Sequence, residues 1–416
     1  MTQSQAAGFA LVGQAFVPVQ HRNMDQMTEP LSRIPTGMRY YFGQEARLRR
    51  TVEETAMTIF DGWSYEEITT PTIDYYSLFE HGMGKTEAHR AFRFTDTDGR
   101  LLALRPDVTS AAARAAATLF AERERPLRLC YAAPVFRQQP QSHAEWRRES
   151  TQIGCELIGA NTRVADLEVL AIASEFLRRL DLEGNYVITL NDVGIFNGVA
   201  ERLKLDPTSR EEMRQLIDVR NAADLERFLT PHSSATEAQA FAQLMQLSGK
   251  RESLDLARSV ISNEQSRAAL DRLESLWNVI ESSDLTHCFE IDLGDVARLD
   301  YYTGLTFKIY VKGAGYRVGS GGRYDGLTAS FGKEEPAVGF VLDLDALTDV
   351  VRLRPADSSS TGTPTEGSPE LRANDPDEKG PRNPRDSGDS SSDPSELFLE
   401  ALKRRAKGER VSLKLR

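Results

Sequence analysis

The sequence has few cysteines and histidines and contains no long apolar run. Its three cysteines lie far apart and form no Cys-x-x-Cys pair, so neither a disulfide framework nor a zinc site is expected. The six histidines show no ligand spacing, and we expect no metal centre. No apolar stretch reaches the roughly 20 residues of a membrane span, and "GFALVGQAFVPV" at 8–19 lacks the preceding basic residues of a signal peptide. These absences predict a cytoplasmic protein that does not associate with a membrane.

An excess of basic residues is also missing. The 416 residues include 51 Lys and Arg against 62 Asp and Glu, which gives a formal net charge of −11. Proteins that hold nucleic acid over a large surface usually carry a basic face. The acidic balance therefore argues against such a surface.

The chain also lacks a recognisable nucleotide-binding loop. "GMGKT" at 82–86 is similar to the end of a phosphate-binding loop, but such a loop requires glycine where this chain has Phe79. "GAGYRVGSGGRYDG" at 313–326 is rich in glycine but lacks the spacing that leads into a dinucleotide-binding helix. We interpret it as a tight hairpin with a close backbone approach, and we expect no cofactor.

The first part of the chain shows a helix followed by short strands. Apolar residues recur at three- and four-residue steps over 43–62, which predicts an amphipathic helix. Its apolar stripe comprises Leu48, Val52, Ala56 and Ile59. Gly62 is placed to end this helix, and Pro71 should break the next strand because proline cannot donate to a sheet ladder. A hairpin is expected with Asp98-Gly99 at its turn.

Strands and helices alternate irregularly through the rest of the chain. Residues 197–285 have mostly helical periodicity and are interpreted as a helical insertion in a strand-rich core. This order predicts an α+β fold and not a regular βαβ series. Further strands are expected at 127–138, 150–159, 186–192, 288–294, 306–313, 316–327 and 337–344, and helices at 109–122 and 164–180.

The composition divides the chain into segments. Residues 1–33 are interpreted as a flexible tail, and 34–350 as the folded domain that contains the insertion. Residues 355–394 are rich in Ser, Pro, Asp and Gly, with almost no large apolar side chains, so they should be disordered. Residues 395–416 recover helical and then strand-like character, and we expect them to dock on the protein or on a partner.

The stretch "TQIGCELIG" at 151–159 carries the first indication of a binding site. On a strand, Gln152, Gly154 and Glu156 share one face, while the apolar residues between them face the core. A missing side chain between an amide and a carboxylate is expected to leave room for a small ligand. The alternative is a polar stripe that faces solvent.

Other polar side chains are expected to join this face. "LRPDVT" places Asp107 and Thr109 at a strand–helix junction, where Asp107 has the alternative role of capping the helix. "VFRQQPQ" places Arg137 at the end of a strand. If "VARLDYYTGLTF" at 296–307 is a strand, its adjacent residues point to opposite faces, so only one of Tyr301 and Tyr302 should face the pocket.

The chemistry of these side chains predicts an amino-acid pocket. Asp, Thr and Gln suit an ammonium group, and Arg137 suits a carboxylate or a phosphate. A glutamate and a tyrosine hydroxyl can bracket the two nitrogens of an imidazole. The set therefore predicts a pocket able to select histidine.

These motifs resemble a known family. "LRPDVT", "VFRQQPQ", "STQIGCELIG", "RLDYYTG" and "SGGRYDGL" occur in the order and rough spacing of histidyl-tRNA synthetase catalytic domains, over about residues 34–350. "FDGWSYEEITTPTID" is similar to the helix–strand dimerisation motif of class II synthetases. The resemblance implies a class II synthetase-like antiparallel sheet flanked by helices.

The resemblance also implies a role for each matching residue. Asp107, which stands where the synthetases have Glu, would hold the α-amino group together with Thr109 and Gln152, and Glu156 and Tyr302 would bind the imidazole. Tyr324 would close the pocket, and Arg137 would face the carboxylate or an α-phosphate. The predicted histidine-binding set is Asp107, Thr109, Arg137, Gln152, Glu156, Tyr301, Tyr302 and Tyr324.

Several departures from the synthetase pattern argue against amino-acid activation. The third class II motif has Gly, Glu and Arg where this chain has Asp343, Asp345 and Ala346. A carboxylate repels a triphosphate, and the arginine that would neutralise it is absent. Arg298 is displaced by one residue within the histidyl block, and Gln139 replaces a glutamate of the second motif. The anticodon-binding domain that follows in these synthetases also has no evident counterpart.

The pattern resembles instead the regulatory subunits of ATP phosphoribosyltransferase, a synthetase-like family without aminoacylation activity. The resemblance implies a non-catalytic subunit whose partner is the short catalytic subunit at the first step of histidine biosynthesis. It implies that the subunit is required for activity and conveys feedback inhibition by histidine, a linkage between two sites. A dimer through 44–75 and a hetero-octamer with the catalytic subunit are expected, without bound tRNA.

Two alternatives stay open at this point. One is an active histidyl-tRNA synthetase fragment that works with a separate anticodon-binding partner and activates histidine with ATP. The other is a standalone amino-acid-binding or tRNA-associated paralogue.

Overall fold

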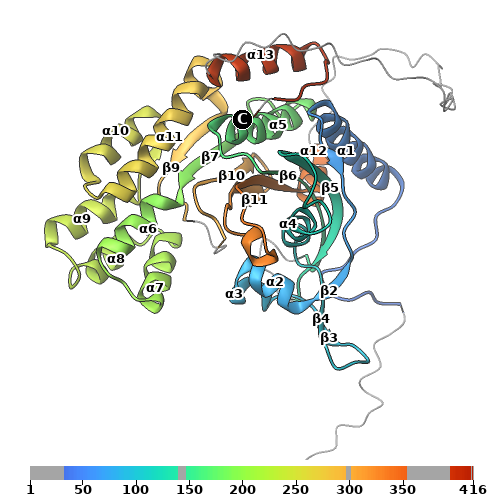
Figure 1. Ribbon diagram of the computed structural model, residues 1–416, viewed down its shortest axis with the longest axis horizontal. Helices are drawn as coiled ribbons and strands as arrows, with labels where there is room; N and C mark the ends of the chain where they lie inside the picture. Colours follow the sequence, from blue (N-terminus) through green and yellow to red (C-terminus); the bar gives the residue numbers. More distant parts are fainter. Residues whose placement is uncertain (1–31, 139–146, 297–300, 354–393, 414, 416) are drawn as a thin grey trace, which may run out of the picture.

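A large mixed sheet forms the centre of the molecule (Figure 1). The computed structural model describes residues 32–138, 147–296, 301–353, 394–413 and 415. The nine-stranded sheet has the order β1-β5-β6-β12-β11-β10-β7-β9-β8, and a second sheet has the order β2-β4-β3. The large sheet is antiparallel except where β1 pairs with β5 and β7 with β9. The predicted α+β fold is confirmed.

The elements have the following bounds. The strands are β1 (Glu66–Glu67), β2 (Ile73–Tyr75), β3 (Arg93–Thr95), β4 (Leu101–Leu104), β5 (Leu127–Phe136), β6 (Glu149–Ile158), β7 (Tyr186–Asp192), β8 (Ser248–Gly249), β9 (Phe289–Asp292), β10 (Leu305–Val311), β11 (Arg317–Arg323) and β12 (Ala337–Asp343). The helices are α1 (Gly43–Gly62), α2 (Tyr76–Met83), α3 (Lys85–Ala88), α4 (Thr109–Ala117), α5 (Arg163–Arg179), α6 (Val193–Arg202), α7 (Pro207–Asp218), α8 (Ala222–Leu229), α9 (Ala235–Leu244), α10 (Arg251–Val260), α11 (Glu264–Ser282), α12 (Leu344–Leu353) and α13 (Pro394–Ala406).

The two faces of strand β6 divide the interior. Ile153, Cys155 and Leu157 are fully buried in the main apolar core, which also contains the buried stripe of α1 and most of α5. Helices α1, α5 and α12 pack on this face of the sheet. Gln152 and Glu156 point the other way, toward the side where α4 packs. The alternation predicted for this strand is confirmed, and it leaves the polar residues on the face that carries the cavity.

Several local predictions are confirmed. Helix α1 has the predicted bounds, the strand after it breaks around Pro71, and β3 and β4 pair as a hairpin around Asp98-Gly99. Two others are wrong. Helix α4 ends at Ala117 instead of 122, and β10 begins only at Leu305, so the tyrosines before it do not lie on a strand.

The segment 197–285 is helical apart from the two-residue strand β8. Helices α6 and α11 pack together, and α11 also packs on β7, which lies between β10 and β9 in the large sheet. These helices extend to one side of the sheet in Figure 1. That they form a separate inserted unit stays a prediction.

The C-terminal segment docks on the protein. Helix α13 packs on α5, and the backbone N–H of Val411 donates to the carbonyl of Gly62 over 2.7 Å. Arg405 forms a buried ion pair with Glu175 of α5, 2.8 Å apart. The predicted helix is confirmed, while residues 409–413 form no strand. Docking on the protein, one of the two predicted outcomes, is confirmed.

Two predicted segments lie outside the described residues except at one end: the tail at 1–33 and the acidic stretch at 355–394. Across the described ranges, no helix has both the length and the hydropathy needed to cross a bilayer.

Candidate functional site

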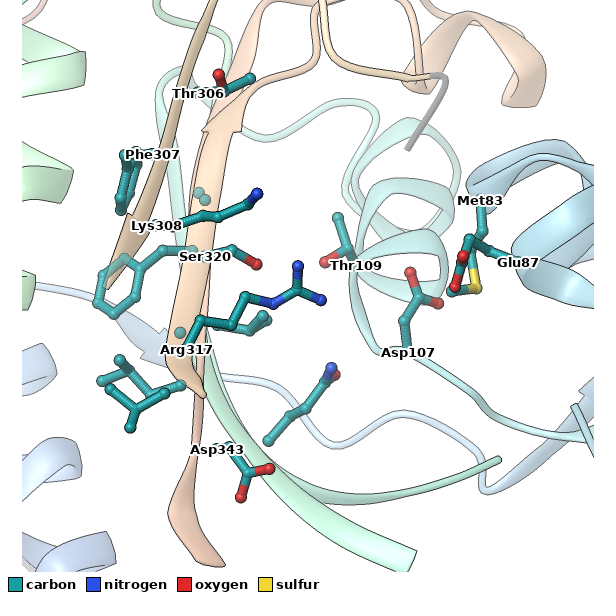
Figure 2. Close-up of a pocket in the computed structure, with 18 of the residues that line it drawn as sticks. Met83, Glu87, Asp107, Thr109, Thr306, Phe307, Lys308, Arg317, Ser320 and Asp343 are labelled. Carbon is teal, nitrogen blue, oxygen red and sulfur yellow. The ribbon is translucent and has the colours of Figure 1, made fainter. Parts of the chain in front are cut away.

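A cavity of about 160 Å³ lies on the α4 side of the large sheet (Figure 2). Strands β6, β10, β11 and β12 form one wall, and the start of α4 faces them. The segment at 301–302 closes one side. All eight residues that the sequence predicted line this cavity: Asp107, Thr109, Arg137, Gln152, Glu156, Tyr301, Tyr302 and Tyr324. That they bind histidine stays a prediction.

Two of the buried acceptors that line the cavity belong to predicted site residues and are left unsatisfied. Asp107 Oδ1 and Gln152 Oε1 have no hydrogen-bond partner within the described ranges. Buried polar atoms are almost always paired, because an unpaired one costs free energy. Two acceptors in one cavity are therefore suited to a ligand that brings donors, such as an ammonium group.

Asp107 is placed by its helix. Its Oδ2 accepts a hydrogen bond from the Ser110 hydroxyl over 3.2 Å, while the N-cap residue of α4 is Val108, which provides no side-chain cap. The alternative that Asp107 caps the helix is confirmed in part, because its carboxylate bonds to Ser110 in the first turn although the N-cap position is Val108. Burial raises the pKa of Asp107 to about 6, against the lowering effects of Ser110 and the charge of Arg137. A cation bound beside this carboxyl would lower its pKa and favour the ionised form.

Glu156 lies deep in the cavity and is held by two tyrosines. Its Oε1 accepts from the Tyr131 hydroxyl over 2.8 Å, and its Oε2 accepts from the Tyr324 hydroxyl. The side chain is 1 % exposed, and burial raises its pKa to about 7 although hydrogen bonds from Tyr324, Thr109 and Tyr131 lower it. Carboxylate oxygens have further lone pairs, so Glu156 retains the capacity to accept from a ligand N–H.

The space beside Gly154 is taken by Tyr131 and not left for a ligand. Tyr131 pairs directly with Gly154 across β5 and β6, and a Cβ at Gly154 would lie 2.8 Å from the Tyr131 hydroxyl. The expectation of room for a ligand at this glycine is therefore wrong. Tyr131 also lies 3.4 Å from the Thr109 hydroxyl. Sequence reasoning missed Tyr131, and the tyrosine opposite a glycine on the preceding strand was the available signal.

Both tyrosines of the "DYYTG" motif face the cavity. The rings of Tyr301 and Tyr302 lie 4.8 Å apart, and Tyr301 lies 5.6 Å from Tyr324. The prediction that only one would face the pocket is wrong, because strand alternation does not apply to a segment that lies before β10. Tyr302 packs on Gly322, where a Cβ would lie 2.7 Å from the ring. The three tyrosine rings give this end of the cavity an aromatic wall suited to a flat ring.

Positive side chains line the other end of the cavity. Lys308 forms an ion pair with buried Asp295, and Arg147 donates to Asp349 over 2.5 Å. Arg317 and Ser320 project from β11 in Figure 2 on the same side as Lys308. Sequence reasoning predicted only Arg137 among the cations. The others carry no motif, and their direction depends on strand register.

The third-motif residues do not all lie where the sequence predicted. Asp343 lines the cavity and caps α12, accepting from the Ala346 N–H over 2.9 Å. Asp345 is not beside the cavity: it is buried, pairs with Arg49 of α1, and accepts from the Thr151 N–H over 2.9 Å. Of the two carboxylates in this motif, only Asp343 lines the cavity. Ala346 is buried in the apolar core; Gln139 and Arg298 lie outside the described residues.

The arrangement suits binding better than covalent chemistry. The cavity offers acceptors for an ammonium group, a carboxylate among aromatic rings, and cations for an anion, which are the elements of an amino-acid site. All three cysteines are buried, and burial raises the pKa of each thiol, which disfavours a nucleophilic thiolate. In the parts of the chain that the structure describes, no group of His, Cys, Asp and Glu side chains could hold a metal ion.

Comparisons with known proteins agree with the motifs. The family model described as histidyl-tRNA synthetase matches residues 37–347. A curated relative from Moorella thermoacetica, an ATP phosphoribosyltransferase regulatory subunit, is 37% identical over 76% of this chain and 80% of its own length. A second, of the same description and from Halothermothrix orenii, is 33% identical over 77% of this chain and 76% of its own length.

A solved structure shares the fold. A crystal structure from Bacillus halodurans, described as an ATP phosphoribosyltransferase regulatory subunit/histidyl-tRNA synthetase, has a TM-score of 0.69 and 27% identity, covering 78% of this chain and 84% of that one. The predicted class II synthetase-like architecture is confirmed by this likeness.

Proposed function

Because this chain belongs to the family of ATP phosphoribosyltransferase regulatory subunits, within the histidyl-tRNA synthetase-like proteins, we propose that it activates a short catalytic subunit and conveys histidine feedback to it. It acts in the first step of histidine biosynthesis and performs no aminoacylation of its own. It binds histidine in the cavity beside β6, works in the cytoplasm, and binds no tRNA. It assembles as a dimer through 44–75 and with the catalytic subunit as a hetero-octamer.

The pair of unsatisfied acceptors, Asp107 Oδ1 and Gln152 Oε1, carries this proposal. They support binding of an α-ammonium group, and the Thr109 hydroxyl lines the same cavity. Glu156 accepts from the imidazole N–H, and the rings of Tyr301 and Tyr302 enclose the ligand. A sensor needs these contacts, whereas it does not need the arginine that Ala346 replaces.

Histidine binding has an energetic route to the proposed dimer interface. The cavity strands lead directly into the elements proposed to assemble: β6 pairs with β5, β12 leads into α12, and α12 packs on α1. A ligand that binds one arrangement of these elements more tightly shifts the population toward it, and binding of the partner shifts in turn.

The test combines the protein with the short catalytic subunit of the same genome. Formation of phosphoribosyl-ATP is followed while histidine is titrated. We expect activity to appear on mixing and to fall with histidine. Gln152→Leu should retain activation and lose most of the inhibition, whereas Gln243→Leu, at an exposed position of α9, should behave as the unmodified protein. Absence of activation on mixing would refute the regulatory function.

One observation favours a second candidate, a synthetase-like enzyme. Several cations line the cavity, and cations of this kind stabilise phosphate charge in amino-acid activation. Histidine-dependent ATP–pyrophosphate exchange by the isolated protein would establish that function. We expect no exchange, because Ala346 provides no charge at the third-motif position.

A further inference from the structure

A β-bulge interrupts the pairing of β10 and β11. Lys308 pairs with Ser320 and Ile309 with Gly319, but Tyr310 pairs with Arg317, so that Val318 is the extra residue. A bulge changes the alternation of side chains beyond it and often re-aims one at a functional site. Here it acts at the wall of the cavity.

The bulge determines which face Arg317 occupies. Lys308 and Tyr310 are two residues apart on β10 and share a face. Directly opposed residues share a face as well, so Ser320 and Arg317 lie on that same side. Without the extra residue, Val318 would oppose Tyr310 and Arg317 would point away. Val318 is instead fully buried in the main apolar core.

The Arg317 side chain points across the cavity toward the start of α4. Figure 2 shows Lys308, Ser320 and Arg317 on the side of the strands that faces α4, with the Arg317 guanidinium directed toward Thr109 and Asp107, while Phe307 points the other way. The charge of Arg317 also acts on Tyr302, where it opposes the rise that burial causes in the hydroxyl pKa. Lys308 forms an ion pair with buried Asp295, and the charge of Arg317 also acts on that carboxylate.

We propose that Arg317 binds the carboxylate of the amino-acid ligand and makes the site specific for the amino acid over its analogues that lack a carboxylate. The inference rests on the proposed histidine-binding function. An ammonium held at Asp107 and Gln152 leaves the neighbouring carboxylate facing β11, where the planar guanidinium can donate two parallel hydrogen bonds. The assignment differs from the expectation that Arg137 faces this group.

The test compares two ligands by titration calorimetry on the full chain. L-histidine and L-histidinol share the imidazole and the ammonium group, but histidinol has a hydroxymethyl group in place of the carboxylate. The unmodified protein should prefer histidine by roughly 10- to 100-fold, the value of a charge-assisted hydrogen bond. In Arg317→Gln this preference should nearly vanish through loss of histidine affinity alone. Arg317→Lys should restore part of it.

Controls separate this role from others. Arg137→Gln should keep the preference, and the urea midpoint of each variant reports its folding. A retained preference in Arg317→Gln, an equal loss for both ligands, or a preference abolished by Arg137→Gln instead would overturn the inference and leave the histidine site intact. Failure of the unmodified protein to bind either ligand would overturn the histidine-binding function and the inference with it.

Discussion

Tyr131 and Gly154 face each other across β5 and β6, and the tyrosine hydroxyl occupies the place that a side chain at 154 would fill. From there it donates to Glu156, two residues along the same strand. The absence of a side chain at Gly154 thus leaves room for Tyr131, and Tyr131 in turn positions the Glu156 carboxylate. A glycine beside a cavity is not by itself evidence of space for a ligand.

Gly154→Ala should disturb both stability and the site. The new Cβ would lie 2.5 Å from the Phe340 carbonyl and 2.8 Å from the Tyr131 hydroxyl, and overpacking of this kind costs about 1–3 kcal/mol. We expect a lower urea midpoint and weaker histidine binding. Gly326→Ala is the matched control, because a Cβ there meets nothing within 4 Å. Equal midpoints for the two variants would contradict the packing described for Tyr131.

Histidine binding should release protons near pH 6. Burial raises the pKa of Asp107 to about 6 and that of Glu156 to about 7, so in the free protein both carboxyls are increasingly protonated below pH 7. The ammonium group at Asp107 favours the ionised form and lowers its pKa, and an imidazole N–H that donates to Glu156 has the same effect there. Affinity should therefore rise between pH 5.5 and 7.5, with the proton release concentrated at the lower end of that range.

Calorimetry in two buffers of different ionisation enthalpy measures the number of protons released. The imidazole of histidine titrates in the same range, so the comparison is with Asp107→Asn, which retains the ligand's own contribution. A proton count that is the same in both proteins would exclude Asp107 from the ammonium site.

The sequence predicted the cavity residues where a local rule determines direction. Alternation on β6 correctly placed Gln152 and Glu156 opposite the core. The same rule was wrong at Tyr301 and Tyr302, because no strand forms there. Arg317 was missed for a related reason: its direction depends on one extra residue in β11. The glycines of this strand are as typical of a close backbone approach as of a bulge, so they do not locate it.

Long-range partners were equally hidden from the sequence. Asp345 belongs to the third class II motif, yet it pairs with Arg49, almost three hundred positions earlier in the chain. This ion pair forms because α1 packs against α12. The apolar periodicity of α1 predicts a buried face but not which helix covers it. The apolar stripe of α1 was predictable, whereas the polar contacts at its edge were not.

Arg49→Met should destabilise the fold strongly. It would leave the Asp345 carboxylate, which is buried, without its cation, and breaking a buried ion pair costs roughly 3–5 kcal/mol. The double variant Arg49→Met/Asp345→Leu should recover much of the loss, since neither charge is then buried. Urea unfolding measures both. If the double variant were less stable than the single one, Arg49 would not be the main partner that stabilises the buried Asp345 carboxylate. Its other donors, including the Thr151 N–H, would then stabilise it.

Arg405→Met should show whether the C-terminal segment is part of the folded domain. Arg405 is buried against Glu175, which also accepts from the Trp63 indole N–H over 2.8 Å. Loss of the cation should lower the free energy of unfolding by about 3 kcal/mol and change the fluorescence of Trp63. The adjacent Arg404 provides a matched control, because its ion pair with Glu409 lies at the surface, where such pairs contribute about 0–1 kcal/mol. Equal effects of Arg404→Met and Arg405→Met on stability would mean that α13 does not pack on α5 in solution. The buried Glu175 carboxylate would then require another cation as its partner.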